Sequence, residues 1–204
     1  MDIYQIIEKR KTCREFLDKD VSQDVIVKIL DAGIKAPSNN HLREWEFVIL
    51  HSREEKEFAL QFAKEWTEQA VKNKLTAGNG AVAQNMYTYA FPRQYTMLMD
   101  APYVIIPFFK GTPAFAQPQY INHLNPLASI WCVIENIFLA ATAEGLACSV
   151  RIPVVDENKK VAQALGVPAE WIMPCYIGIG YPKDSQKIEQ TACRIEDKLH
   201  FGKW

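Results

Sequence analysis

Residues 9–14 (KRKTCR) place four cations and one hydroxyl group within six positions near the start of the chain. Arginine guanidinium groups make charge-assisted, often bidentate hydrogen bonds to phosphate oxygens, and a threonine hydroxyl adds another donor. This run could therefore hold a phosphate group. A solvated basic surface segment explains the same composition, so both interpretations stay open from the local sequence.

A second polar group occupies residues 36–48 (APSNNHLREWEFV). Small residues and amides between a helix and a strand can offer donors and backbone N–H groups to a flat heterocycle. An ordinary helix-to-strand connection is the alternative, because Asn and Ser are standard turn residues. Neither Ser38, Ser129 nor Cys148 has a convincing His–carboxylate arrangement, so a nucleophilic triad is not expected. With only four histidines and no C-x-x-C pair, a metal site is not expected either.

The chain has 204 residues, of which 49% are hydrophobic and 23% charged, which suits a single domain over residues 1–204. A net charge of −1 gives no overall field that would attract nucleic acid or anionic lipid. No uninterrupted apolar run approaches the roughly 18 residues of a membrane span, and the N-terminus lacks the pattern of a secretory signal. The five widely spaced cysteines indicate free thiols. We therefore expect a cytoplasmic protein with neither nucleic acid nor a membrane as its partner.

Hydrophobic periodicity predicts alternating helices and strands, which favours a layered α/β sandwich. The predicted helices cover Asp2 to about Lys9, Ser22 (the N-cap) to a stop at Pro37, Glu54 to about Lys74, and Asp156 to Leu165. The predicted strands cover Trp45 to Leu50, Tyr103 to Phe109, Cys148 to Val154 and Met173 to Tyr181. Residues 76–80 should break the third helix, residues 81–100 should be helical only in part, and the proline-rich residues 111–126 should form a loop or lid.

The strongest predicted element is the helix from Leu127 to Gly145, which is apolar on nearly every face. Such a helix must be buried on most sides, either inside a large core or between two subunits. Gly145 is suited to its C-cap.

Several motifs, in their order along the chain, resemble the nitroreductase family. They are an R-x-[ST]-x-R stretch after a first helix (residues 10–14), an amphipathic helix that ends in A-P-S, and a W-x-F-V strand that follows it. ENIFLAATAEGL (residues 135–146) is similar to the family's central dimer-interface helix. LGVP (165–168), IGIGYP (177–182) and HFGKW (200–204) are similar to its final third. The resemblance is poor between residues 64 and 126, a variable region that we expect to cover the substrate.

This resemblance implies a three-layer α-β-α sandwich with a mixed, mainly antiparallel central sheet, in an intertwined homodimer that holds one FMN at each interface. It implies a flavoenzyme that passes electrons from NADH or NADPH to a small organic acceptor (nitroaromatic, quinone or enone) by a ping-pong mechanism. The flavin itself carries the chemistry, so no catalytic side chain is required. Two alternatives stay open: another reaction on the same scaffold, such as dehalogenation or flavin fragmentation, or flavin binding without catalysis. A pyridine-nucleotide protein without flavin is disfavoured, because no G-x-G-x-x-G follows a strand.

The resemblance also assigns cofactor contacts to the basic residues. Arg10 would face the FMN phosphate and ribityl chain, and Lys11 and Thr12 would add backbone and hydroxyl contacts. Arg14 would lie at the pyrimidine edge near N1, where a cation stabilises the negative charge of a reduced flavin. Arg194 corresponds to a C-terminal basic position that contacts the phosphate.

Two further segments are assigned by the same resemblance. Contacts from the other subunit would come from Pro37, Ser38, Asn39 and His41, and contacts beside the ring face would come from Arg151, Ile152 and Pro153. The chain departs from the family where Asn, Gln and Pro commonly precede the Trp, because His41, Arg43 and Glu44 stand there. These ionisable groups could alter the redox behaviour or substrate preference, or could simply face solvent.

Overall fold

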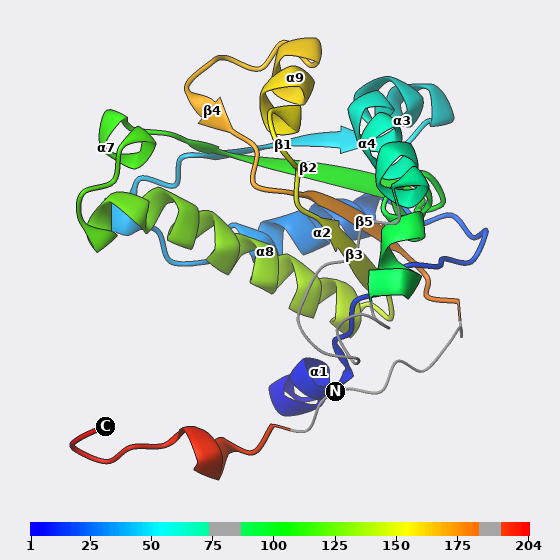
Figure 1. The fold of residues 1–204 in the computed structure, drawn as a ribbon. Helices are drawn as coiled ribbons and strands as arrows, with labels where there is room; N and C mark the ends of the chain where they lie inside the picture. Colours follow the sequence, from blue (N-terminus) through cyan, green and yellow to red (C-terminus); the bar gives the residue numbers. More distant parts are fainter. Residues whose placement is uncertain (74–86, 184–192) are drawn as a thin grey trace.

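The computed structural model describes residues 1–73, 87–183 and 193–204. Its helices form two layers with an antiparallel sheet between them (Figure 1). The strand order is β1–β2–β5–β3. The strands are β1 (Trp45–Leu50), β2 (Tyr103–Lys110), β3 (Ala147–Arg151), the short β4 (Trp171–Ile172), which pairs with β2, and β5 (Tyr176–Gly180). The predicted three-layer sandwich is confirmed.

The strand ladders are antiparallel, and a single parallel bridge joins Thr12 to Cys148. This bridge places the segment after the first helix alongside β3, at an edge of the sheet. A second bridge joins Phe16 to Pro182, so the same segment continues past the end of β5. The basic run of residues 9–14 is thereby anchored to the sheet.

One face of the sheet is covered by α8 (Asn125–Ala143) and α2 (Gln23–Gly33), and α1 (Ile3–Lys9) contacts α8. Aliphatic side chains fill this layer, among them Ile26, Ile29, Ile105, Val133, Ile134, Ile137, Ile177 and Ile179. α1 begins with a capping box, in which Asp2 accepts from the N–H of Gln5 and the Gln5 side chain accepts from the N–H of Asp2.

The other face is covered by α3 (Arg53–Ala59), α4 (Gln61–Lys72), α6 (Thr96–Met99) and α9 (Glu157–Ala164). Successive side chains of a strand point to opposite faces, so β2 serves both cores. Tyr103, Ile105 and Phe109 enter the α2/α8 layer, whereas Val104, Ile106 and Phe108 enter the α3/α4 layer.

Several predicted boundaries were wrong. The second helix ends at Gly33, before the predicted stop at Pro37, and a turn at residues 34–35 follows it. Proline disfavours a helical backbone only at Ala36, so it does not set this earlier end. The Ser22 side chain makes no capping hydrogen bond, although Val21 and Ile26 lie in one core cluster as a hydrophobic staple requires. The helix predicted from Glu54 is two helices, which meet at Leu60. This break places Leu60 and Ala63, both fully buried, against the sheet.

The region predicted as a loop or lid contains two short helices, α7 (Pro113–Ala116) and η3 (Ile121–Leu124). α8 starts at Asn125, earlier than predicted, because proline is tolerated in a first helical turn. β3 ends at Arg151 and not at Val154, since Pro153 cannot donate to a ladder. The predicted break at residues 76–80 and the first part of residues 81–100 lie outside the described residues. The rest of that second segment is helical with interruptions, as predicted.

By length and composition, residues Ile121–Ala143 meet the criteria for a membrane-crossing helix, with a mean hydropathy of 1.5 in an 18-residue window. The prediction from uninterrupted apolar runs had found no such segment. Core helices of soluble proteins pass the same test, and one side of α8 packs on the sheet through Ile130, Val133, Ile134 and Ile137, all fully buried.

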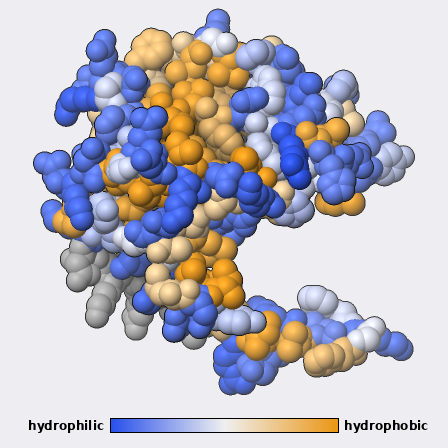
Figure 2. All heavy atoms as spheres, turned by 180° about the vertical axis from the view of Figure 1, so that it is seen from behind, coloured by the Kyte–Doolittle hydropathy of each residue, from blue (hydrophilic) through white to orange (hydrophobic). Residues whose placement is uncertain are grey.

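The C-terminal residues 193–204 extend away from the rest of the chain (Figure 1). Apolar side chains lie along this arm in Figure 2, and Phe201 and Trp204 are 91% and 101% exposed. Large apolar side chains left this exposed commonly mark a surface that binds another molecule.

The packing of α2 on α8 yields a stability prediction. A Cβ added at Gly33 would lie 2.8 Å from Ile137 Cγ1, in a fully buried contact. Gly33→Ala should therefore lower the free energy of unfolding by about 1–3 kcal/mol in urea denaturation, although alanine favours helix. In an Ile137→Ala background, which removes the clash, the same change should cost measurably less. An unchanged or higher stability of Gly33→Ala would contradict this packing.

Candidate functional site

A small hollow lies beside the basic run at the edge of the sheet. Arg10, Lys11 and Thr12 form its polar side. Its other walls come from α8 and β3, through Phe138, Thr142, Cys148 and Val150. The hollow therefore combines two cations and a hydroxyl group with a largely apolar floor.

The backbone fixes this arrangement. The N–H of Cys13 donates to the carbonyl of Cys148 (2.8 Å), which continues the bridge between Thr12 and Cys148. Strand alternation turns Cys148 and Val150 toward α8 and the hollow, and turns Ser149 and Arg151 to the opposite face. Burial raises the pKa of the Cys148 thiol well above its ordinary value, so this cysteine is an uncharged wall and not a nucleophile.

The two arginines of the basic run have different surroundings. Arg10 is partly exposed, and within the described part of the chain its only ion pair is a loose one to Glu135 on α8, with Nε and Oε1 4.0 Å apart. Such exposed pairs are weak, so Arg10 remains available to an anion. Arg14 is more enclosed: its Nε is buried without a hydrogen-bond partner among the described residues, and burial lowers its pKa. Buried donors are normally hydrogen-bonded, so a partner from outside the described residues is expected here, and a bound ligand is one such partner.

The loop of residues 37–44 packs on the first turns of α8. The N–H of Asn39 donates to Ser129 Oγ (3.0 Å), and Asn125 Nδ2 donates to Asn39 Oδ1 (3.2 Å). Pro37 and His41 are exposed. Asn40, His41 and Arg43 adopt positive φ values of 52°, 56° and 50°, an uncommon conformation for residues other than glycine.

Glu44, one of the departures from the family pattern, forms an ion pair with Lys110 at 3.2 Å and is only partly buried. This ion pair at the surface is a structural role for Glu44 that does not involve a cofactor. Arg43 and His41 remain exposed beside it.

The two predicted halves of the site therefore lie at different places along α8 of the same chain. The loop contacts Ser129, whereas the hollow is lined by Phe138 and Thr142. At about 1.5 Å per residue, Ser129 and Phe138 are about 14 Å apart along the helix axis. Within one chain, the structure does not bring Ser38, Asn39 and His41 to the basic run.

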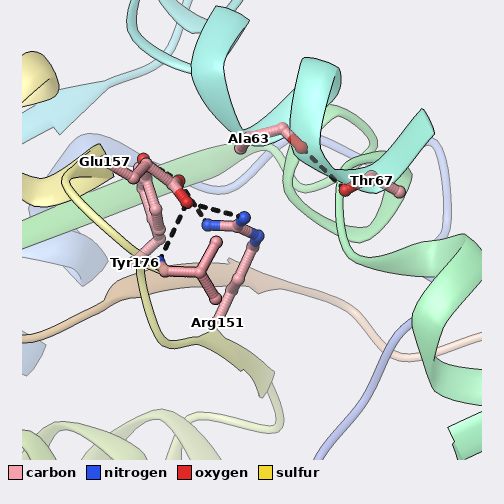
Figure 3. Close-up of polar contacts among 6 residues, drawn as sticks. Ala63, Thr67, Arg151, Glu157 and Tyr176 are labelled. Atoms are coloured by element: carbon pink, nitrogen blue, oxygen red, sulfur yellow. Dashed lines mark hydrogen bonds and ion pairs between the residues drawn. The ribbon is translucent and has the colours of Figure 1, made fainter. Parts of the chain in front are cut away.

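Arg151 does not face the hollow. Its guanidinium lies in the α4/α9 layer, where it pairs with Glu157, and Nη2 donates to Glu157 Oε2 at 2.8 Å (Figure 3). Arg151 and Glu157 are both almost fully buried. Any contact of Arg151 with a cofactor on the α8 side would therefore have to come from its backbone.

The turn that follows β3 is exposed and strained. Ile152 is 52% exposed and Val155 is 94% exposed. Val155 has a φ of 53°, which is an outlier for a β-branched residue and costs on the order of 1–3 kcal/mol. Strain of this kind persists only where the surrounding contacts impose it. Here the neighbouring Val154 is held by hydrogen bonds to Glu157.

Arg194 lies on the C-terminal arm, where it is exposed and 3.6 Å from Glu196. The structure thus leaves it apart from the basic hollow. Most aromatic residues of the variable region are packing groups, since Phe108 and Phe109 are buried in the two cores and Phe91 packs against Trp66 and Tyr87.

Sequence reasoning missed Glu157, Tyr176 and the strain at Val155. Glu157 is an acidic residue at the start of a helix, where acids are common, so the sequence gives no sign of its buried partners. Val155 is left-handed although it is not a glycine, so the sequence does not mark that turn either. One usable signal was Arg151 itself, because a charged residue in an apolar strand needs a buried partner.

The antiparallel sheet between two helical layers, with a long apolar helix on one side, defines the nitroreductase-like class of α/β folds. The match to the family model described as "Nitroreductase family" spans residues 7–181. The chain therefore belongs to the nitroreductase family of flavin oxidoreductases.

Individual relatives cover the whole chain at low identity. A protein of Archaeoglobus fulgidus with the provisional name NADH dehydrogenase/NAD(P)H nitroreductase is 24% identical, over 98% of this chain and 97% of its own. A solved BluB-like flavoprotein from Clostridium difficile 630 is 20% identical, with a TM-score of 0.76 and full coverage of both chains. A solved iodotyrosine deiodinase, bound to FMN and 3-iodo-L-tyrosine, is 18% identical, with a TM-score of 0.75 and full coverage of both.

Proposed function

We propose that this protein is an FMN-dependent oxidoreductase that takes electrons from NADH or NADPH and passes them to a small organic acceptor. The observation that carries the proposal is the hollow at residues 10–12, where cations and a hydroxyl group adjoin an apolar floor. In the single chain the hollow holds only about 10 Å³, so it would anchor the phosphate end of FMN, and the flat ring would lie beyond it, between two subunits. The Nε of Arg14, which is buried with no partner among residues 1–73, 87–183 and 193–204, supports the same assignment.

The roles of the side chains follow from this geometry. Arg10, Lys11 and Thr12 would bind the phosphate end, since charge-assisted hydrogen bonds to phosphate are strong. Arg14 would donate to the pyrimidine edge of the ring and oppose negative charge there. Cys148 and Val150 would exclude water from the apolar side. When bound, FMN would supply the hydride and electron transfer, and the chain would orient it and set its potential.

We further propose that the working form is a homodimer built around α8. The outward face of α8 carries Ala128, Cys132, Glu135, Leu139 and Ala143 at helical spacing. All but Glu135 are apolar or small, which allows a second helix to approach closely. If two copies of α8 cross in antiparallel fashion, the loop of residues 37–41 from one subunit approaches the basic hollow of the other. The exposed apolar arm of residues 193–204 would then pack on the partner and could bring Arg194 to its phosphate.

The acceptor is proposed only as a class: nitroaromatic, quinone or enone. Among the relatives, an iodotyrosine deiodinase holds 3-iodo-L-tyrosine and another protein is named 4-nitrobenzoate reductase, so related chains act on more than one kind of substrate. All five cysteines are free, which suits a reducing cytosol and supports a cytoplasmic location.

The direct test is reduction of the bound flavin. The purified protein should release FMN, and not FAD, when heated, as identified by chromatography. Anaerobic addition of NADH or NADPH should rapidly bleach the visible flavin absorbance. Bound FMN that neither nucleotide reduces would instead indicate a flavin-binding protein without this activity.

Arg10 and Arg14 should differ in effect when each is replaced by alanine. Arg10→Ala should weaken FMN binding at least tenfold in a titration of the apoprotein, because a charged hydrogen bond contributes roughly 1.5–3 kcal/mol. The midpoint potential of the FMN that still binds should stay nearly unchanged. Arg14→Ala should lower that potential by tens of millivolts, since about 1.4 kcal/mol corresponds to roughly 30 mV for two electrons. Equal losses of affinity alone would place both arginines at the phosphate.

The homodimer can be tested through Cys132, which is exposed in the single chain. A dimer around α8 should slow its reaction with a thiol reagent at least tenfold compared with a cysteine introduced at Lys159, on the exposed side of α9. Light scattering should give twice the mass of the chain at micromolar concentration. A stable monomer in which Cys132 reacts as fast as the introduced cysteine would exclude this interface.

A further inference from the structure

The Glu157 carboxylate gathers donors from three elements of the fold. Oε1 accepts from Arg151 Nη1 and from the hydroxyl of Tyr176 (2.6 Å), and Oε2 accepts from Arg151 Nη2 (2.8 Å) and from the N–H of Val154 (3.2 Å). The N–H of Glu157 in turn donates to the carbonyl of Val154 (3.0 Å). One residue thus holds both backbone polar groups of Val154, next to the strained Val155.

Stability alone does not explain this cluster. A buried ion pair contributes little compared with apolar residues of the same volume, because both charges must be desolvated. Both Nη atoms of Arg151 donate to Glu157, whereas its Nε is buried without a partner among the described residues. Burial, together with the Glu157 charge, raises the pKa of Tyr176, so its hydroxyl remains a donor. The hydrogen bonds of this network require specific geometry, so they fix the positions of Glu157 and of the backbone that it contacts.

The cluster lies on the face of β3 opposite the hollow. Figure 3 shows the Arg151 and Tyr176 side chains converging on Glu157 beneath α4. The rings of Trp66 and Tyr176 lie 5.6 Å and 5.4 Å from the Arg151 guanidinium carbon and enclose it. The exposed turn of residues 152–155 is therefore held by Arg151, Glu157 and Tyr176. The side chains of these residues lie on the far side of the sheet and cannot reach a ligand at the hollow.

We propose that Glu157 is a positioning residue: with Arg151 and Tyr176 it holds the turn of residues 152–155, in which Val155 is left-handed, and so presents that turn to the flavin ring. The inference rests on the proposed function and on the family resemblance, which puts Arg151, Ile152 and Pro153 beside the flavin ring. Residues on the α4/α9 side of β3 would therefore set the geometry of a cofactor that binds on the α8 side.

The test compares Glu157→Gln with a matched control, Leu50→Ala. Leu50 is buried at the end of β1, the strand at the opposite edge of the sheet from β3, so its truncation destabilises the same fold without touching the turn. Glu157→Gln should raise the Kd for FMN at least tenfold, shift the midpoint potential of the FMN that binds, and speed hydrogen exchange at the Val154 amide of the apoprotein at least tenfold. Leu50→Ala should leave all three within about twofold of wild type.

A double variant separates positioning from stability. Arg151→Met with Glu157→Gln removes the uncompensated buried charge, so its resistance to urea should recover relative to Glu157→Gln alone. The loss of FMN affinity should persist, because the turn is still unbraced. Recovery of affinity together with stability would overturn the proposal, as would equal Val154 exchange in wild type and Glu157→Gln. If wild type bound no FMN, the proposed function would fail, and the exchange measurement would still decide whether Glu157 holds the turn.

Discussion

The structure depends on the burial of α8, a helix that is apolar on almost every side. The sheet, α2 and α1 cover only part of it, and fully buried isoleucine and valine side chains on that part form the center of one core. The remaining face carries small and apolar residues with a single acid, Glu135. Water is an unfavourable neighbour for such a surface. The same helix that organises one layer of the sandwich therefore favours a second copy of the chain on its other side.

Strand alternation then divides the chemistry between two faces of the sheet. On β3, Cys148 and Val150 point toward α8 and line the basic hollow, whereas Arg151 points the other way into its pair with Glu157. A cofactor on the first face would be held by the cations of residues 10–14, and the turn beside it would be set from the second face. In this account the buried ion pair sets the orientation of the turn, Arg10 contributes to the affinity for FMN, and the more enclosed Arg14 sets its potential.

Much of this could be predicted from the sequence, because the strongest signals were local and periodic. The apolar strand at Tyr103 and the helix around Val133 are present as predicted, apart from their exact ends. The role of the basic run in binding a phosphate stays a prediction. The failures have non-local causes. The helix predicted from Glu54 is interrupted at Leu60, and both Leu60 and Ala63 are buried against the core. Hydrophobic periodicity alone does not reveal such an interruption. Arg151 was assigned to a cofactor from its position in a motif, yet which face its side chain occupies depends on strand register and on a partner, Glu157, that no motif marks.

The central claim is that FMN binds where two subunits meet, and sedimentation velocity recorded at both the protein and the visible flavin absorbance tests it most directly. The account predicts that all protein-bound flavin sediments with the dimer, at one FMN per chain, and that dilution into monomer releases it. Flavin that sediments with a monomer at full occupancy would contradict the shared site. Flavin absorbance that never sediments with the protein would contradict the assignment of the cofactor itself.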